Sequence, residues 1–321
     1  MQHEDDEDDD RVSPHLFGEV LEPSEASEPI LAKGVRGALL EWLTEIWAEE
    51  DLREAGLKPR HRALFSGKPG TGKTTLAHHL AARLGLAMLV VRPEMLRSKY
   101  IGQTGEQIGR LFKMAREANP PIILFFDEFD AIAQSRVAVD QASDREHNAI
   151  VNVLLQRVEQ HKGYIIAATN FAQHLDPAIW RRFDVHIEID LPGRFERERI
   201  LARYLEPWGL PKAALRMLAD SFETASPALI RQFAEALKRN LVIGPKVEWD
   251  MRRDAVIDRV LAGTQPHPDL GKPRLWSHGS KDHAVREMQW PLPRKEDVVE
   301  EAPATEAATD NVVAIPKRAV T

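Results

Sequence analysis

The sequence predicts an α/β protein in which a parallel sheet is sandwiched by helices and is followed by a smaller, all-helical domain. Short apolar runs alternate with helical patterns from Ala63 to about Asp190. Several runs are apolar throughout, as expected of parallel strands covered on both faces. After Pro192 only helical periodicity continues.

The expected elements can be placed along the chain from their periodicity. A helical pattern at residues 31–54 precedes the sheet. The expected strands are Ala63–Phe65, Ala87–Val91, Ile122–Phe126, Tyr164–Thr169 and Val185–Ile189. The expected later helices are Phe195–Leu205, Pro211–Asp220, Pro227–Asn240 and Val247–Leu261. Ser226 and Pro227 favour a helix start, as N-cap and first helical residue.

These patterns divide the chain into four parts. Residues 1–29 are acidic and rich in proline and serine, so we expect a disordered tail there. Residues 30–192 are the expected α/β domain and residues 193–262 the helical lid domain. Residues 263–321 are rich in proline and charge, and we expect them to be mostly disordered. Trp276 and Trp290 are unusual in such a tail and pack either on the body of the chain or on a partner.

Composition narrows the classes of function. The net charge is −7, and residues 4–10 alone supply seven negative charges, so no basic excess favours nucleic-acid binding. The acidic run is interpreted as a solvated tail, with a docking role as the alternative. The absence of cysteine excludes disulfides and thiolate metal sites. No apolar run approaches 18 residues and the N-terminus is acidic, so we expect a soluble, cytoplasmic protein.

A phosphate-binding loop is predicted between the first strand and the next helix. The stretch "GKPGTGKT" fits the pattern G-x-x-x-x-G-K-[ST] and follows a strand, as the motif requires. Its glycines let backbone N–H groups turn toward phosphate oxygens, and Lys73 should reach the β- and γ-phosphates. The alternative is a glycine-rich turn without a ligand. We predict that ATP is bound by Gly67, Pro69, Gly70, Thr71, Gly72, Lys73, Thr74, Thr75 and Asp127.

Two carboxylates follow the buried strand Ile122–Phe126. Thr74 is expected to ligate Mg²⁺ directly and Asp127 to hold it through water. Glu128 can orient and deprotonate an attacking water, which predicts hydrolysis as well as binding. The alternative is a pair of ordinary acids at a strand end.

Polar groups after the next two strands extend the predicted site. Asn170 follows the strand ending at Thr169 and can hold the attacking water or touch the γ-phosphate; a turn-forming asparagine is the alternative. Arg181 and Arg182 have no obvious pairing partner in the sequence. They are predicted to act as arginine fingers on a neighbour's nucleotide.

The order of these motifs resembles the AAA family within the AAA+ ATPases, over about residues 30–262. Gly67–Thr74 is similar to Walker A, Ile122–Glu128 to Walker B and Asn170 to sensor 1. The adjacent arginines in "WRRFD" are closer to the spacing in katanin and spastin than to that in FtsH-like proteins. The resemblance implies a single ATPase module in a homo-oligomer, commonly a hexameric ring. Arg231 lies a few residues beyond the usual sensor 2 position, so that role is left unassigned.

The resemblance also gives a role to the loop "KYIGQTGEQI". It is similar to the family's first pore loop, so Lys99, Tyr100, Ile101 and Gly102 are expected to grip an extended polypeptide in the central channel. Residues 135–146 would form a second pore loop. The alternative is a connecting loop with an incidental tyrosine.

The sequence therefore favours an ATP-driven motor that remodels protein substrates through a pore. Within these residues neither an adaptor domain nor a zinc-protease motif is recognised. One rival is a ring scaffold that activates a separate partner enzyme, such as a protease, without threading. A second and weaker rival is a DNA-directed loader, which the aromatic loop and the charge balance disfavour.

Overall fold

The computed structural model of the chain describes residues 12–96, 103–133 and 142–298. Within these ranges there are eight short 3-10 helices: Pro14–Leu16, Pro23–Glu25, Phe129–Ala131, Ala172–His174, Gly244–Val247, Pro268–Leu270, Gly279–Lys281 and Lys295–Asp297. Within the described ranges, no helix combines the length and apolar character needed to cross a bilayer.

The centre of the first domain is a six-stranded sheet with the strand order β1-β3-β4-β5-β2-β6. Its strands are β1 (Gly18–Leu21), β2 (Arg62–Ser66), β3 (Ala87–Val91), β4 (Ile122–Phe126), β5 (Ile165–Thr169) and β6 (Val185–Glu188). All neighbouring pairs are parallel except β1 with β3. The parallel α/β sheet predicted from the apolar runs is thereby confirmed, and the carboxyl ends of β2, β4 and β5 meet at one edge, where α/β proteins bind ligands.

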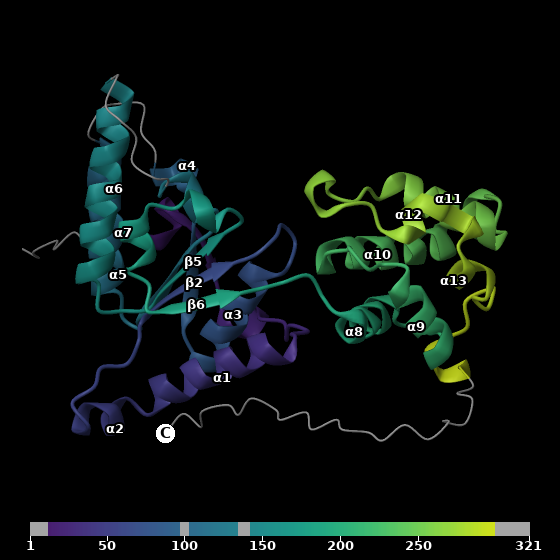
Figure 1. Cartoon of the computed structure of the whole chain (residues 1–321), viewed down its shortest axis with the longest axis horizontal. Helices are drawn as coiled ribbons and strands as arrows, with labels where there is room; N and C mark the ends of the chain where they lie inside the picture. The colour runs from purple at the N-terminus through teal and green to yellow at the C-terminus, as the bar shows by residue number, and fades with distance from the viewer. Residues whose placement is uncertain (1–11, 97–102, 134–141, 299–321) are drawn as a thin grey trace, which may run out of the picture.

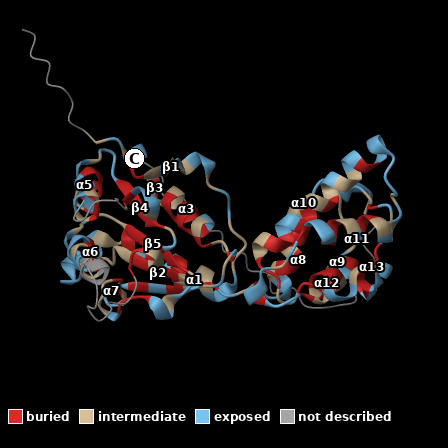
Figure 2. Cartoon of the chain, turned by 90° about the horizontal axis from the view of Figure 1, so that it is seen from above, coloured by how far each residue is buried: buried red, intermediate tan, exposed pale blue. Residues whose placement is uncertain are grey.

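Helices cover both faces of this sheet (Figure 1). One face packs on α1 (Lys33–Trp47) and α3 (Lys73–Leu84), and the other on α5 (Gln103–Glu117), α6 (Ala142–Gln160) and α7 (Pro177–Trp180). The short helices α2 (Glu49–Glu54) and α4 (Pro93–Leu96) lie in connections. Figure 2 shows the buried residues concentrated between the sheet and these two layers. The two apolar clusters are called here the α5-side core and the α3-side core.

A helical lid follows the sheet and has its own apolar cluster, the lid core (Figure 1). Its helices are α8 (Arg194–Leu205), α9 (Lys212–Asp220), α10 (Pro227–Ile243), α11 (Arg253–Gly263), α12 (Arg274–His278) and α13 (His283–Arg286). The helix predicted at Val247–Leu261 begins later, at Arg253. The reason is local: Val247 ends a 3-10 turn and Glu248 has φ 56°, a left-handed conformation that interrupts a helix.

The N-terminal segment corrects the prediction of a disordered tail over residues 1–29. Its described part forms β1 at the edge of the sheet, and Phe17 is only 1% exposed. Gly18 permits this pairing, because a Cβ there would lie 1.8 Å from the carbonyl oxygen of Val90. Overall acidity and proline content hid a short apolar stretch, "LFGEVL", that buries enough surface to fix the segment.

The C-terminal segment corrects the prediction of disorder from residue 263 onward. Residues 264–298 pack on the lid. Trp276 is 8% exposed, lies edge-on to Phe222 and Phe233, and donates from Nε1 to the carbonyl of Thr264. Trp290 packs against the lid core. Both tryptophans therefore pack on the body of the chain. Of the charged residues between them, Lys281, Arg286 and Glu287 are exposed, whereas Asp282 is buried.

Candidate functional site

The phosphate-binding loop joins the carboxyl end of β2 to the first turn of α3. Gly67, Gly70 and Gly72 all have positive φ values, of 153°, 75° and 94°. Position 67 also has no room for a side chain, because a Cβ there would lie 2.3 Å from the carbonyl oxygen of Ile189. The backbone thus curls in front of the α3 N-terminus, where N–H groups and the helix dipole favour an anion.

Lys73 lies at the centre of this curl and is 7% exposed. Its Nζ donates to the carbonyls of Gly67 and Lys68, at 2.8 and 3.0 Å, and to Oδ1 of Asn170 at 2.7 Å. Burial lowers the pKa of the Lys73 amine, and the negative charges of Asp127 and Asp130 oppose that effect. The ammonium is therefore held inward by neutral acceptors, in a place where phosphate oxygens would be stronger partners.

A hydroxyl and a carboxylate meet beside this lysine. Thr74 Oγ1 donates to Oδ2 of Asp127 at 3.0 Å, which joins the first turn of α3 to the end of β4. Such a pair of hard oxygen donors suits Mg²⁺, which uses few protein ligands and keeps several waters. Within the described residues, no group of three or more His, Asp or Glu side chains could hold a metal by itself. The donor set therefore fits a cation that arrives with phosphate.

Glu128 follows Asp127 in an unusual backbone conformation. It has φ 47° and ψ 46°, its N–H donates to Asp127 Oδ1 at 3.0 Å, and its side chain lies in the exposed wall of the cavity. A left-handed conformation costs a non-glycine residue about 1–2 kcal/mol. The turn thereby directs one acid toward the cation position and leaves the next acid open to the cavity.

Asp130 and Thr169 belong to the same network but were not among the predicted residues. Thr169 is fully buried, and its hydroxyl donates to Asp130 Oδ1 at 2.6 Å and accepts from the N–H of Phe171 at 3.0 Å. This network fixes the backbone on both sides of Asn170. The spacing Asp127-x-x-Asp130 was the available signal, but a third carboxylate just after a strand has no unique meaning in sequence.

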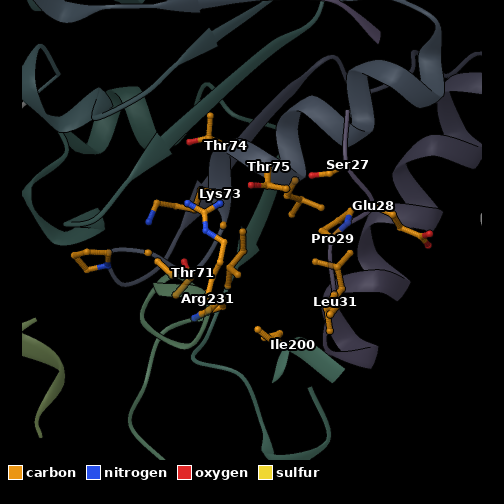
Figure 3. A pocket seen from close by; sticks show the side chains of 18 of the residues that line it. Ser27, Glu28, Pro29, Leu31, Thr71, Lys73, Thr74, Thr75, Ile200 and Arg231 are labelled. Atoms are coloured by element: carbon orange, nitrogen blue, oxygen red, sulfur yellow. The ribbon is translucent and has the colours of Figure 1, made fainter. Parts of the chain in front are cut away.

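These groups line a cavity of about 440 Å³ between the sheet and the lid (Figure 3). Apart from Gly67, every predicted ATP-binding residue is in its wall, together with Glu128 and Asn170. The opposite wall was missed by the sequence reasoning. It consists of residues 27–31 from the N-terminal segment, Ile189, and the lid residues Ile200, Arg203, Tyr204, Pro227, Ala228 and Arg231.

The lid touches the phosphate-binding loop directly. The N–H of Ala228 donates to the carbonyl of Gly70 at 3.2 Å, and Ser226 caps α10 by accepting from the N–H of Leu229. Arg231 projects into the cavity from the same helix (Figure 3), with its guanidinium 6.0 Å from the ring centre of Tyr204. Ile200, Tyr204 and Pro227 make the side of the cavity away from the phosphate loop partly apolar, as a nucleobase would require.

Arg181 and Arg182 lie outside the cavity wall, after α7. Arg181 is exposed, whereas Arg182 has a partner that the sequence did not suggest: its Nε lies 3.3 Å from Oε2 of Glu159 on α6. Asp176, 2% exposed, caps α7 by accepting from the N–H of Ala178 at 2.8 Å. The arginines therefore occupy a fixed turn on the surface of the subunit, and their predicted role on a neighbour stays a prediction.

The predicted first pore loop, Lys99, Tyr100, Ile101 and Gly102, lies outside the described residues. The same holds for residues 135–141 of the predicted second pore loop.

Comparison with known proteins identifies the part of the chain that carries this site. Residues 63–191 match the family model "ATPase family associated with various cellular activities (AAA)". An uncharacterized AAA family ATPase, y4kL, of Sinorhizobium fredii is 42% identical over 188 residues, which are 56% of this chain and 56% of the relative. The proteasome-activating nucleotidase of Pyrococcus abyssi is 36% identical over 195 residues, 58% of this chain and 48% of the relative.

A third relative extends the match further along this chain. The ATP-dependent zinc metalloprotease FtsH 3 of Sphaerobacter thermophilus is 33% identical over 233 residues, 70% of this chain and 47% of the relative. The chain thus spans about half the length of these relatives.

Proposed function

We propose that the chain, which matches the AAA family of ATPases over residues 63–191, hydrolyses ATP to remodel or unfold protein substrates as part of a homo-oligomeric, commonly hexameric, ring. The observation that carries the hydrolytic part is the pair of contacts Lys73–Asn170 and Thr74–Asp127. They join the phosphate-binding helix to the ends of two strands, around a cavity of nucleotide size.

Binding would use the preformed loop. The N–H groups of residues 70–74 and the α3 N-terminus would hold the phosphates, and Lys73 would exchange its carbonyl partners for phosphate oxygens. Mg²⁺, held by Thr74 directly and by Asp127 through water, would neutralise charge that develops on the β- and γ-phosphates. The partly apolar wall opposite, including Ile200 and Tyr204, would receive the base.

Hydrolysis requires a base near the γ-phosphate, and Glu128 is the exposed acid next to Asp127 on the phosphate-loop side of the cavity. It would take a proton from water as the water oxygen bonds to the γ-phosphorus and the bond to the β-phosphate oxygen breaks. Asn170, held by Lys73 and flanked by the Thr169 network, would orient that water. Arg181 and Arg182 would stabilise the transition state in the neighbouring subunit's site, an effect of about 10³–10⁵ in rate.

Two substitutions test this assignment. Lys73→Ala should abolish ATP binding, because the charge nearest the β- and γ-phosphates is lost. Glu128→Gln should bind ATP but hydrolyse it at least about 10²-fold more slowly, since general acid–base catalysis contributes roughly 10²–10⁴. Binding is measured by titration with a fluorescent ATP analogue and hydrolysis by phosphate release. A Glu128→Gln variant that hydrolyses ATP at the parental rate would show that another group is the base.

A second candidate function follows from the relatives' names. Several are proteasome-activating nucleotidases, and one is a putative 26S proteasome regulatory subunit homolog. These names favour a ring that acts with a separate partner protease, either by threading substrates into it or by activating it as a scaffold. Tyr100 separates these modes. If the chain threads, Tyr100→Ala should abolish substrate unfolding at near-parental ATP turnover, whereas Tyr100→Phe should retain both. Retention of unfolding in Tyr100→Ala would favour the scaffold.

A further inference from the structure

Residues 12–31, called here the N-terminal strap, contact all three apolar clusters formed by the described residues. Phe17 is buried in the α5-side core, and Val12 and Val20 pack against it. Leu21 and Leu31 pack against the α3-side core. The strap thus crosses the edge of the sheet from one face to the other before α1 begins.

The same strap reaches the lid. Ile30 packs against the lid core. The carbonyl of Glu28 accepts a hydrogen bond from Nη1 of Arg203 on α8, at 2.6 Å. Among the residues that the structure describes, these contacts fix strap residues 28–30 against the lid, on the side of the cavity that faces the phosphate-binding loop in Figure 3.

Polar contacts hold the middle of the strap on α3. The ring of His78, 9% exposed, lies with Nε2 2.8 Å from the carbonyl oxygen of Glu22. Glu22 and Glu25 form a capping box around the short helix Pro23–Glu25. The strap is therefore attached to the helix that carries Lys73 and Thr74, as well as to the lid.

We infer that the strap positions the lid over the nucleotide cavity, with Phe17 as its anchor in the sheet core and Arg203 as its attachment to the lid. Both are positioning residues for the site proposed above, and the inference rests on that proposed function. Residues 27–31 supply cavity wall only while the strap is docked. Phe17 is the largest side chain that holds it, since β1 contributes just four residues of pairing.

Population arithmetic gives the size of the effect. The apparent dissociation constant equals the intrinsic constant divided by the fraction of molecules in the binding-competent form. Releasing the Phe17 anchor removes one fully buried aromatic ring from a segment otherwise held by short pairing, single hydrogen bonds and partly buried aliphatic side chains. If about a tenth of the molecules keep the strap docked, the dissociation constant for ATP rises about tenfold.

The experiment compares Phe17→Ala with Leu154→Ala. Leu154 is fully buried in the same α5-side core, on α6, and makes no wall of the cavity. Both variants lose core packing, but only the first releases the strap. We expect Phe17→Ala to raise the dissociation constant and the KM for ATP about tenfold with kcat within about twofold, and Leu154→Ala to change neither by more than about twofold. Phe17→Leu should restore most of the affinity.

A disulfide provides a rescue that reattaches the strap to the sheet without Phe17. Glu19 and Val90 are opposite each other in the antiparallel β1–β3 pair, a spacing compatible with a disulfide, and the chain has no other cysteine. Glu19→Cys with Val90→Cys, added to Phe17→Ala, should regain near-parental ATP affinity when oxidised and lose it on reduction. At the lid end, Arg203→Met should weaken ATP binding, and Arg199→Met on the same helix should not.

The outcomes separate this inference from the proposed function. If the parental chain fails to bind ATP, the proposed function is wrong. If the parent binds ATP and Phe17→Ala binds equally well, the strap does not position the lid. An equal loss in Leu154→Ala, or no recovery on oxidation, overturns the inference as well.

Discussion

Gly67→Ala tests whether the phosphate-binding loop depends on a close backbone approach. In the folded chain the new Cβ would lie 2.3 Å from the carbonyl oxygen of Ile189, a backbone atom at the end of β6. Contacts of this kind below 3.0 Å are essentially never seen, so the two backbones must separate by roughly 0.7 Å. The residue must also keep a φ of 153°, which only glycine adopts without strain.

The expected loss in function follows from that displacement. The carbonyl of Gly67 accepts from Nζ of Lys73 at 2.8 Å, so moving the loop moves the lysine and the N–H groups that would hold phosphate. A misplacement of about 1 Å in a preorganised site can cost about 10²-fold in rate. We therefore expect Gly67→Ala to lower kcat/KM for ATP by about 10- to 100-fold.

Two glycines serve as matched controls. Gly72 has φ 94° and Gly85 has φ 70°, and a Cβ at either position meets nothing within 4 Å. Gly72→Ala adds backbone strain in the loop without a clash, and Gly85→Ala adds the same strain at the far end of α3. Each of these two substitutions should lower the free energy of unfolding by about 1 kcal/mol, as measured by thermal unfolding. Kinetics are measured by phosphate release. Parental kcat/KM in Gly67→Ala, or an equal loss in Gly85→Ala, would refute the argument from close approach.

Three further predictions concern the neighbour's site, pH and the C-terminal segment. Lys73→Ala subunits and subunits with Arg181→Ala and Arg182→Ala should each be nearly inactive, but mixed rings should regain ATPase activity; no recovery, with mixing confirmed, would contradict arginines acting across an interface. Burial, together with the nearby positive charges of His61 and Arg116, lowers the pKa of His161 to about 4 from 6.5, so the folded chain favours the neutral ring. The neutral His161 ring therefore stabilises the fold above pH 6.5, and this stabilisation is lost as the pH falls toward 4, by up to about 3 kcal/mol in the free energy of unfolding. His161→Gln should flatten that part of the stability–pH profile, and an unchanged profile would contradict the prediction. Trp276→Ala should lower the free energy of unfolding by about 3–5 kcal/mol, measured by denaturant titration, because the indole is buried against Phe222 and Phe233. A change near zero would show that residues 264–298 do not stabilise the lid.

The sequence alone predicted five of the six described strands, all but β1, and the residues that line the phosphate-loop side of the cavity. The strand β4 was predicted with its observed bounds because five consecutive apolar residues between Pro121 and Asp127 are typical of a buried parallel strand. The loop from Gly67 to Thr74 was recognisable because its chemistry depends on neighbours in the chain. The glycines of the loop, the start of the following helix and Lys73 all lie within eight consecutive residues.

Only the tertiary structure decided the other half of the cavity and the fate of the two ends. Residues 27–31 and Arg231 are separated by about two hundred residues in sequence, and neither carries a local motif that marks a nucleotide wall. The N-terminal segment has the composition of a disordered tail, yet Phe17 finds a place in the α5-side core that the later chain creates. Trp276 likewise is buried because it packs against Phe222 and Phe233 of the lid. Local sequence patterns predict the secondary structure and loop conformation of a segment, whereas its burial depends on surfaces that distant segments supply.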